Sequence, residues 1–282
     1  MPIVLEKLTH TYLPSSVMES TAVNDVSLTV NDGEFLGVIG HTGSGKSTLI
    51  QHMNGLLQPT SGRVTVNGID LADKSTRREV RRQVGMLFQY PEYQLFEETI
   101  AKDVAFAPKH LGVKEAEIEP LVRAAMETVG LPYEEYAEKS PFELSGGQKR
   151  RVALAGILAT APKILILDEP MAGLDPRGRE EILSLIKKLN SEGTTIVMVS
   201  HSMDDIARLA DRVAVMSEGS LRMLGTVAEV FSRPEELMEI GLDVPEAAKL
   251  AAALRARGLA VPQEVFRIDQ LYEFLRNRWK NA

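Results

Sequence analysis

The 282-residue chain contains no cysteine, which excludes disulfide bonds and thiolate metal sites. No apolar run approaches the roughly 18–20 residues that a membrane-spanning helix needs, and charges at Glu6 and Lys7 argue against a signal peptide. Acidic residues number 39 against 32 basic ones, giving a net charge of −7. Since no strongly basic segment is evident, we do not expect nucleic acid as the main partner. Any membrane role must come through another protein.

Short apolar runs alternate with helical periodicity along the chain, which predicts an α/β fold. Predicted strands cover residues 3–8, 22–30, 34–39, 63–66, 84–88, 164–167, 195–199, 213–216 and 221–224. Predicted helices cover residues 47–54, 145–159, 177–190 and 203–210, and a helical stretch at 99–129 is interrupted at Gly112 and Pro120. A turn signal at residues 31–33 predicts a hairpin between the strands that flank it.

A change of composition after about Pro234 indicates a boundary. We predict a main domain over residues 1–233, with a helical subdomain at about 90–160. The C-terminal region, residues 234–282, is expected to form two amphipathic helices, at 245–257 and 269–280. No internal repeat or low-complexity tract appears.

A glycine-rich loop after the strand predicted at 34–39 matches the pattern G-x-x-x-x-G-K-[ST]. Its glycines let backbone N–H groups turn toward phosphate oxygens, and the N-terminus of the next helix adds its dipole. Lys46 supplies a charge for the β- and γ-phosphates, and Ser47 supplies a ligand for Mg²⁺. We therefore predict binding of a nucleoside triphosphate by Gly40, His41, Thr42, Gly43, Ser44, Gly45, Lys46, Ser47 and Thr48.

Two carboxylates, Asp168 and Glu169, follow the short apolar strand predicted at 164–167. Asp168 suits the water shell of Mg²⁺, and Glu169 suits polarising the water that attacks phosphate. The simpler interpretation is that the pair only caps the following turn. The phosphate loop upstream favours the catalytic interpretation.

A third motif, Ser145-Gly146-Gly147-Gln148, opens a predicted helix. Its N–H groups and dipole could stabilise a γ-phosphate that approaches from the opposite side. An ordinary helix cap is the alternative, but two glycines in the first turn of a helix cost about 1 kcal/mol each.

The order of these motifs resembles that of ATP-binding-cassette (ABC) ATPases over roughly residues 3–231. The resemblance implies an ABC ATPase domain of the P-loop NTPase class, with a mixed central sheet, an antiparallel β subdomain and a helical subdomain. It implies that the signature of one subunit completes the ATP site of another, with ATP and Mg²⁺ as ligands. By the same resemblance, Gln89 senses Mg²⁺ and the membrane partner, Asp175 lies in a loop that crosses the dimer interface, His201 contacts the γ-phosphate, and Tyr12 stacks on adenine.

A narrower match follows Gln89. Residues 89–99 and 103–108 are similar to a segment of energy-coupling-factor (ECF) transporters for vitamins and transition metals, most like the second of their two ATPases. Ala107 and Met171 depart from the usual glycine and threonine of that family. The resemblance implies a paralogous second ATPase, a transmembrane coupling subunit that docks near residues 89–103, a separate substrate-binding membrane protein, and a peripheral location on the cytoplasmic face of the cell membrane.

The docking segment is acidic, with carboxylates at Glu92, Glu97, Glu98 and Asp103. We expect these groups to receive arginines of the transmembrane partner, although a solvated charged face is the plainer alternative. The C-terminal helices are expected to contact the second ATPase. The transported substrate is not encoded in this chain.

Three other functions stay open at this stage. The chain could serve a conventional ABC importer, a soluble ABC ATPase outside transport, or a regulatory module that binds nucleotide without hydrolysis. The segment after Gln89 argues against the first. The presence of one cassette, with only about a hundred residues between Lys46 and Ser145, argues against the second. The intact set of Asp168, Glu169 and His201 argues against the third.

Overall fold

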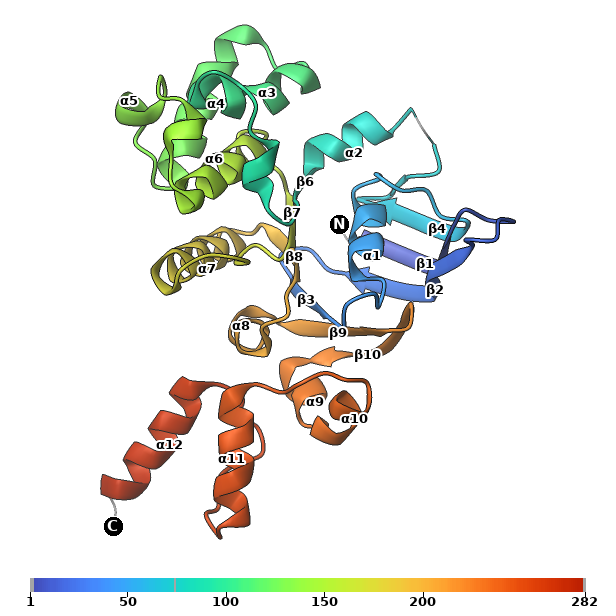
Figure 1. Cartoon of the computed structure of the whole chain (residues 1–282), viewed down its shortest axis with the longest axis vertical. Coiled ribbons are helices and arrows are strands. Elements are labelled where there is room, and N and C mark those ends of the chain that lie inside the picture. The colour runs from blue at the N-terminus through green and yellow to red at the C-terminus, as the bar shows by residue number, and fades with distance from the viewer. Residues whose placement is uncertain (1–2, 74, 281–282) are drawn as a thin grey trace.

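The computed structural model describes residues 3–73 and 75–280. Its centre is a six-stranded sheet in the order β10-β9-β3-β8-β7-β6 (Figure 1). All neighbours are parallel except the hairpin of β9 with β10. Four of the parallel strands, β3, β8, β7 and β6, are buried at every position, as expected for a parallel sheet covered on both faces. The strands are β3 (Phe35–Ile39), β6 (Val84–Leu87), β7 (Ile164–Asp168), β8 (Thr195–Val199), β9 (Arg212–Ser217) and β10 (Ser220–Thr226).

A second, antiparallel sheet has the order β2-β1-β4-β5. Its strands are β1 (Ile3–Tyr12), β2 (Ser20–Val30), β4 (Ser61–Val66) and β5 (Ile69–Asp70). Helix α1 (Lys46–Met53) buries Leu49, Ile50 and Met53 in a core shared with both sheets. The phosphate loop therefore emerges between two layers that fix its position.

The hairpin predicted at residues 31–33 is wrong. The chain does turn there, but β2 pairs with β1 in the antiparallel sheet, whereas β3 pairs with β8 and β9. The physical reason lies in burial: β3 is buried at every position and belongs in the middle of the parallel sheet, while β2 alternates between buried and exposed residues over much of its length. A turn signal reports a change of direction, not a pairing.

A helical layer covers one end of the molecule, above the central sheet in Figure 1.

One helix of this layer, α4 (Glu115–Thr128), contains Pro120. The interruption predicted at Pro120 is wrong, because α4 continues through it. Proline removes a hydrogen bond to the carbonyl four residues earlier, and that residue, Ala116, is exposed, so water can serve its carbonyl. Gly112 does end α3, at φ 77°. The layer consists of η1 (Pro91–Gln94), α3 (Ile100–Leu111), α4 (Glu115–Thr128), α5 (Tyr133–Tyr136), η2 (Pro141–Glu143) and α6 (Gly146–Leu158).

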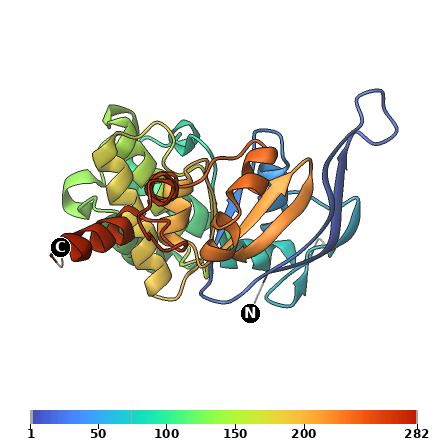
Figure 2. The same ribbon diagram turned by 90° about the horizontal axis from the view of Figure 1, so that it is seen from below.

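The C-terminal helices lie at the opposite end from this layer (Figures 1 and 2). Helices α11 (Glu246–Ala256) and α12 (Ile268–Lys280) confirm the two that the sequence predicts, and they share a small core of their own. The sequence did not predict α2, α9 or α10. The remaining helices are α2 (Arg77–Gln83), α7 (Pro176–Ser191), α8 (Met203–Leu209), α9 (Val227–Phe231) and α10 (Pro234–Glu239). Among the described residues, no helix has the length and apolar character that crossing a membrane requires.

Candidate functional site

The phosphate loop connects β3 to α1 and depends on its glycines. Gly43 and Gly45 have φ of 83° and 97°, a region that other residues rarely adopt. A Cβ on Gly45 would also lie 2.2 Å from the carbonyl oxygen of Ala22, and a Cβ on Gly40 would lie 2.4 Å from that of Met216. The loop can therefore hold this shape only with glycine at these positions.

Lys46 folds back into the loop that contains it. Its Nζ donates to the carbonyl oxygens of Gly40, at 2.7 Å, and His41, at 2.9 Å. Burial lowers the pKa of Lys46, while the nearby carboxylates Glu169 and Asp168 oppose that shift. The hydroxyl of Ser44 is fully buried and has no hydrogen-bond partner among the described residues. The amine is held by neutral carbonyl oxygens, and the hydroxyl has no partner, so a phosphate group would supply the negative charge and the acceptor that these groups lack. The loop therefore fits a nucleotide.

Asp168 lies next to Ser47, although 121 positions separate them in the chain. The Ser47 hydroxyl lies close enough to the Asp168 carboxylate to lower the pKa of that group. Burial raises the pKa of Asp168, and the Ser47 hydroxyl and the charge of Lys46 counteract it. Both side chains offer oxygen atoms, which are the ligands Mg²⁺ prefers. The pair fits the magnesium site that the sequence predicts.

Glu169 has a strained backbone and a shifted pKa. Its φ is 49°, and its N–H donates to the carbonyl of Val199 at 3.1 Å, which ties it to the next strand. Burial raises the pKa of Glu169 to about 7; a hydrogen bond from the backbone of His201 works against this, and the charge of Asp168 adds to it. A carboxylate that titrates near neutral pH is suited to taking a proton from water.

His201 follows β8 and lies beside Glu169 at the carboxyl ends of the parallel strands. Its Nε2 lies 3.4 Å from Oε1 of Glu169, and its side chain is 57% exposed. Burial lowers the pKa of His201 and the charge of Lys46 lowers it further, so the neutral imidazole is favoured. Gln89 follows β6, the strand beside β7, and is exposed at the same carboxyl ends of the strands. The structure thus brings together residues from four strand ends, as in other open α/β sheets.

Tyr12 lies at the end of β1, beside this group. Its hydroxyl is 3.2 Å from Oγ1 of Thr48 on α1, and its ring packs edge-on against His10 with centroids 4.5 Å apart. The ring is 40% exposed. Tyr12 is therefore fixed next to the phosphate loop, and its side chain is partly exposed there.

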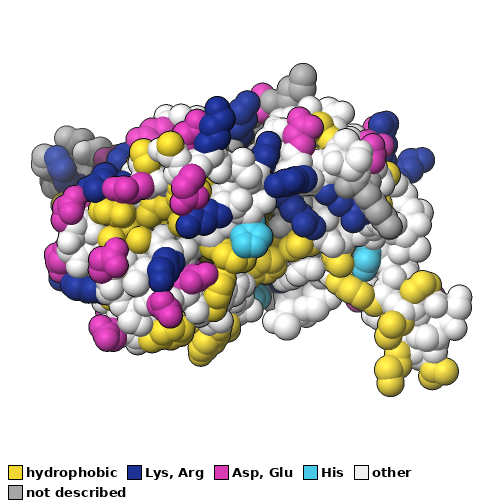
Figure 3. Space-filling view, turned by 90° about the horizontal axis from the view of Figure 1, so that it is seen from above, with side chains coloured by type: hydrophobic (Ala, Val, Ile, Leu, Met, Phe, Trp, Pro, Cys, Tyr) yellow, Lys and Arg dark blue, Asp and Glu magenta, His cyan; other side chains and the backbone are white. Residues whose placement is uncertain are grey.

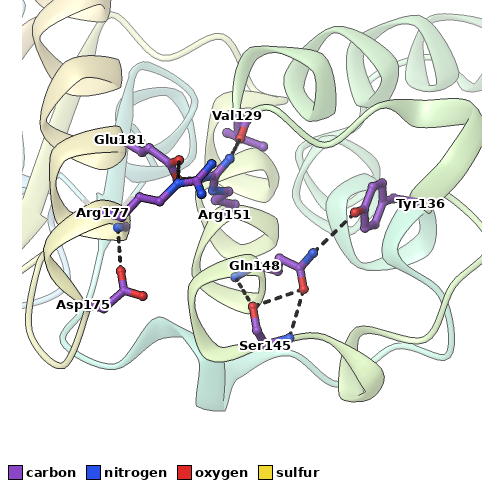
Figure 4. A network of polar contacts seen from close by, with 9 residues as sticks. Val129, Tyr136, Ser145, Gln148, Arg151, Asp175, Arg177 and Glu181 are labelled. Atoms are coloured by element: carbon purple, nitrogen blue, oxygen red, sulfur yellow. Dashed lines mark hydrogen bonds and ion pairs between the residues drawn. The ribbon is translucent and has the colours of Figure 1, made fainter.

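The signature residues lie elsewhere, at the N-terminus of α6 (Figure 4). Ser145 caps the helix: its Oγ accepts from the N–H of Gln148 at 3.3 Å, and Gln148 Oε1 accepts from the N–H of Ser145 at 3.1 Å. A Cβ on Gly146 would meet no atom within 4 Å, and one on Gly147 only Leu174 at 3.9 Å. The glycines are not required by the packing of this chain, and they line an open cleft.

That cleft has a volume of about 780 Å³ and lies between α6 and the start of α7. Asp175 caps α7 by accepting from the N–H of Gly178 at 2.7 Å. Arg151 of α6 pairs with Glu181 of α7, and Glu181 also accepts from Arg177 at 3.1 Å (Figure 4). The signature and the loop of Asp175 are therefore held as one unit. No hydrogen bond or ion pair joins Ser145–Gln148 to the phosphate loop in the described part of the chain.

Sequence reasoning missed Arg150, the largest fully buried side chain. Its guanidinium donates to both carboxylate oxygens of Glu92, at 3.1 and 3.2 Å, and to the carbonyls of Pro170, at 3.1 Å, and Ala172, at 2.6 Å. It joins the signature helix to the segment after Gln89 and to the turn after Glu169. The available signal for a buried arginine was the pair Arg150-Arg151, which directly precedes the apolar part of this helix.

Arg150 also corrects the interpretation of the acidic segment. Glu92 is paired inside the protein, and Asp103 accepts from the N–H groups of Phe96 and Glu97 at 2.9 and 3.0 Å. Neither is free to receive an arginine from a partner, because each already satisfies groups of this chain. Of the four carboxylates, Glu97 and Glu98 remain outside such structural roles, and Glu98 pairs with Lys102 on the surface.

Similarity to known proteins identifies the family. A family model for ABC transporters matches residues 23–172. The chain belongs to the ABC transporter family. Within it, the chain groups with the energy-coupling factor transporter ATP-binding proteins: it is 54% identical to EcfA2 of Clostridium perfringens, over 98% of this chain and 99% of that relative. It is 56% identical to EcfA2 of Symbiobacterium thermophilum, over 98% and 96%.

Solved structures of this family have the same fold. CbiO1 of Clostridium perfringens, described as part of the ABC transporter complex cbiONQ, superposes with a TM-score of 0.74 at 34% identity, covering 90% of this chain and 98% of that one. The ATP-binding cassette MJ0796, solved as a dimer bound to ADP and phosphate, gives 0.71 at 30% identity, covering 80% and 98%. The predicted ABC ATPase fold and the resemblance to the second ECF-type ATPase are confirmed. This ABC ATPase is an ATP-hydrolysing transporter subunit.

Proposed function

We propose that the two halves of the site act in different subunits. Residues 40–48 hold the phosphates of ATP, with Lys46 at the β- and γ-phosphates and Tyr12 against the adenine. The signature residues Ser145–Gln148 close over the γ-phosphate bound by a second subunit. The observation that carries this proposal is the open cleft lined by Gly146 and Gly147 at the N-terminus of α6, which has room for a ligand that this chain alone does not bring there.

We propose that Glu169 takes the proton of the attacking water. Its elevated pKa and its position beside His201 support this role. His201, neutral and largely exposed, donates from its imidazole toward the γ-phosphate. Ser47, Asp168 and Gln89 would hold Mg²⁺, which neutralises phosphate charge when bound. Asp175 belongs to the surface that meets the second subunit.

We propose that a transmembrane coupling subunit docks on the segment from Gln89 to Asp103. Tyr93 and Phe96 are 84% and 56% exposed there, and the rings of Phe96 and Phe106 pack edge-to-face with centroids 4.9 Å apart. Such an aromatic surface with Glu97 and Glu98 at its side suits an amphipathic helix that carries arginines. Movement of Glu92 would reach α6 directly through Arg150.

We propose the division at about residue 233, with the helical subdomain at about 90–160 and the C-terminal helices as a contact with the second ATPase. An apolar groove of about 600 Å³ lies between α11 and α12 and is lined by Leu250, Ile268 and Tyr272, which are all more than half exposed. Exposed apolar grooves mark protein contacts. Residues 234–282 also contribute Leu237, Leu242, Val244 and Phe266 to the main core, so this region is not a separate folding unit.

The relatives' names support a place in an energy-coupling factor transporter. We propose that the chain works with a paralogous ATPase and a separate substrate-binding membrane protein, on the cytoplasmic face of the cell membrane, in the uptake of a vitamin or another micronutrient. Affinity purification from native membranes followed by mass spectrometry tests this. Recovery of a paralogous ATPase with a coupling subunit supports the proposal. Recovery of only a homodimer with an unrelated permease contradicts it.

A further inference from the structure

Helix α2 carries charge of a sign opposite to that of the whole protein. Its seven residues, Arg77–Gln83, include four arginines and one glutamate, whereas the chain has a net charge of −7. The expectation that no strongly basic segment exists is therefore wrong at this helix. The segment is short, and its character becomes evident only once α2 is seen as a helix on the surface.

Two of the arginines have structural roles. Arg78 Nη2 donates to the carbonyl of His110 at 3.1 Å, and Arg82 Nε donates to that of Leu111 at 3.1 Å. These carbonyls belong to the last turn of α3, where cations are stabilised by the helix dipole. Val80 is fully buried beneath the helix. Helix α2 is thus fixed against the helical layer.

The other two arginines have no such role. Arg77 and Arg81 are one helical turn apart and make no ion pair or hydrogen bond with another described residue through their side chains. Nε and Nη2 of Arg77 are buried without a partner. Like charges four residues apart repel, and a buried donor without an acceptor is unfavourable. The described part of the protein therefore supplies no anion to the guanidinium groups of Arg77 and Arg81.

The position of α2 indicates where that anion lies. The helix leads directly into β6 and hence into the docking segment, and it touches the end of α3. Figure 3 looks onto this end of the molecule, where basic side chains gather beside exposed hydrophobic ones. The docking segment that follows β6 carries the exposed aromatic residues Tyr90, Tyr93 and Phe96. Arginines beside aromatic rings are typical of surfaces that meet the interface of a bilayer.

We propose that the arginine face of α2 binds the phosphate headgroups of anionic lipids that surround the membrane subunit. The inference rests on the proposed docking, which brings this end of the protein to the bilayer. A lipid surface presents many phosphates in one plane, and planar guanidinium groups bind phosphate through paired hydrogen bonds. Arg81, which is exposed, contributes the free donors. Arg77, whose Nε and Nη2 are buried, adds its charge beside Arg81, while Arg78 and Arg82 hold the helix.

Vesicle binding by the full chain tests the proposal. Vesicles of phosphatidylcholine alone are compared with vesicles that also contain phosphatidylglycerol, for the parent protein and for R77Q/R81Q. The matched control is K187Q/K188Q, which removes the same charge from exposed positions on α7. We expect binding only to the anionic vesicles, weaker at high salt, and about fivefold weaker for each arginine removed, with the control unchanged. Binding that is the same for R77Q/R81Q and the parent overturns the proposal, as does equal binding to neutral vesicles.

Copurification in detergent separates this proposal from the docking proposal. R77Q/R81Q should still copurify with the membrane subunits and should retain its circular dichroism spectrum and ATP binding. Loss of the detergent complex would assign these arginines to an acidic segment of the membrane protein instead of lipid, and would refute the lipid proposal. Charge reversal at Glu97 and Glu98 tests docking alone. If that change leaves copurification intact while R77Q/R81Q loses vesicle binding, docking through Glu97 and Glu98 fails, whereas lipid binding by α2 is supported.

Discussion

The two helix N-termini that we propose to bind phosphate are built in contrasting ways. Helix α1 begins after Gly45, has no side-chain cap, and is enclosed by its own loop and by Lys46. Helix α6 begins after Ser145, carries a complete capping box, and opens on a cleft. The glycines of the first are required by the fold of this chain, and those of the second are not. The difference is what the proposed shared site requires: one N-terminus is enclosed within the chain, and the other opens on a cleft.

Glu169→Gln should give the largest effect. Removing the proton acceptor should slow ATP hydrolysis by about 10²–10⁴-fold while leaving nucleotide binding unchanged, because a glutamine side chain keeps the size of Glu169 and the backbone contacts at that position. Steady-state hydrolysis by the assembled transporter, with nucleotide binding measured in parallel, checks this. Glu192→Gln is the control, because Glu192 lies before β8, at the end of the strands opposite to Glu169. Near-normal turnover of the Glu169 variant would refute its role as the base.

Alanine substitutions at Gly45 and at Gly146 should have different effects, because the two helix N-termini are built differently. Gly45→Ala should abolish ATP binding by the isolated chain, because the new methyl group would collide with the carbonyl of Ala22. Gly146→Ala should leave that binding intact and stabilise the chain by about 0.5–1 kcal/mol, as expected for alanine within a helix. Its hydrolysis in the assembled complex should nevertheless fall, since the methyl group occupies the approach to the partner's phosphate. Normal hydrolysis by Gly146→Ala would contradict the role given to the cleft.

Arg150→Met tests whether the two halves are joined through the buried guanidinium. The change leaves Glu92 and two carbonyl groups without their donor, and should lower the free energy of unfolding by about 3–5 kcal/mol. Urea denaturation measures the loss. A second substitution, Glu92→Gln, should recover part of it, because it removes the unpaired charge. Loss of the same size in single and double variants would indicate that Glu92 is not the important partner.

The pH dependence of Glu169 gives the smallest predicted effect. Since burial raises its pKa from 4.5 to about 7, the folded state holds a proton more tightly than the unfolded state does. The contribution of this group to stability is therefore complete below about pH 4.5 and is lost as the pH rises through about 7. The stability difference between the parent and Glu169→Gln should shift in that window, and hydrolysis should rise over it. A difference independent of pH would refute the shifted pKa.

Much of the site was evident from local sequence. The glycine loop, the carboxylates after β7 and the signature each depend on a few adjacent residues, and each was found at the end of the element that the sequence predicts. The pairing of β2 was not predictable from its turn, and Glu92 seemed free because Arg150 is 58 residues away. Helix α2 escaped notice because seven residues are too few for a clear periodic pattern.

The sequence by itself determined which groups can bind phosphate and where helices begin around them, because those properties follow from glycine conformation and from neighbours along the chain. Only the tertiary structure decided which groups meet. It placed Ser47 beside Asp168, raised the pKa of Glu169 through burial, and connected the signature helix to the segment after Gln89 through Arg150. It also separated the two N-termini proposed to bind phosphate, since the parallel sheet lies between α1 and α6 (Figure 1). Burial and distance belong to the folded chain, and no local pattern encodes them.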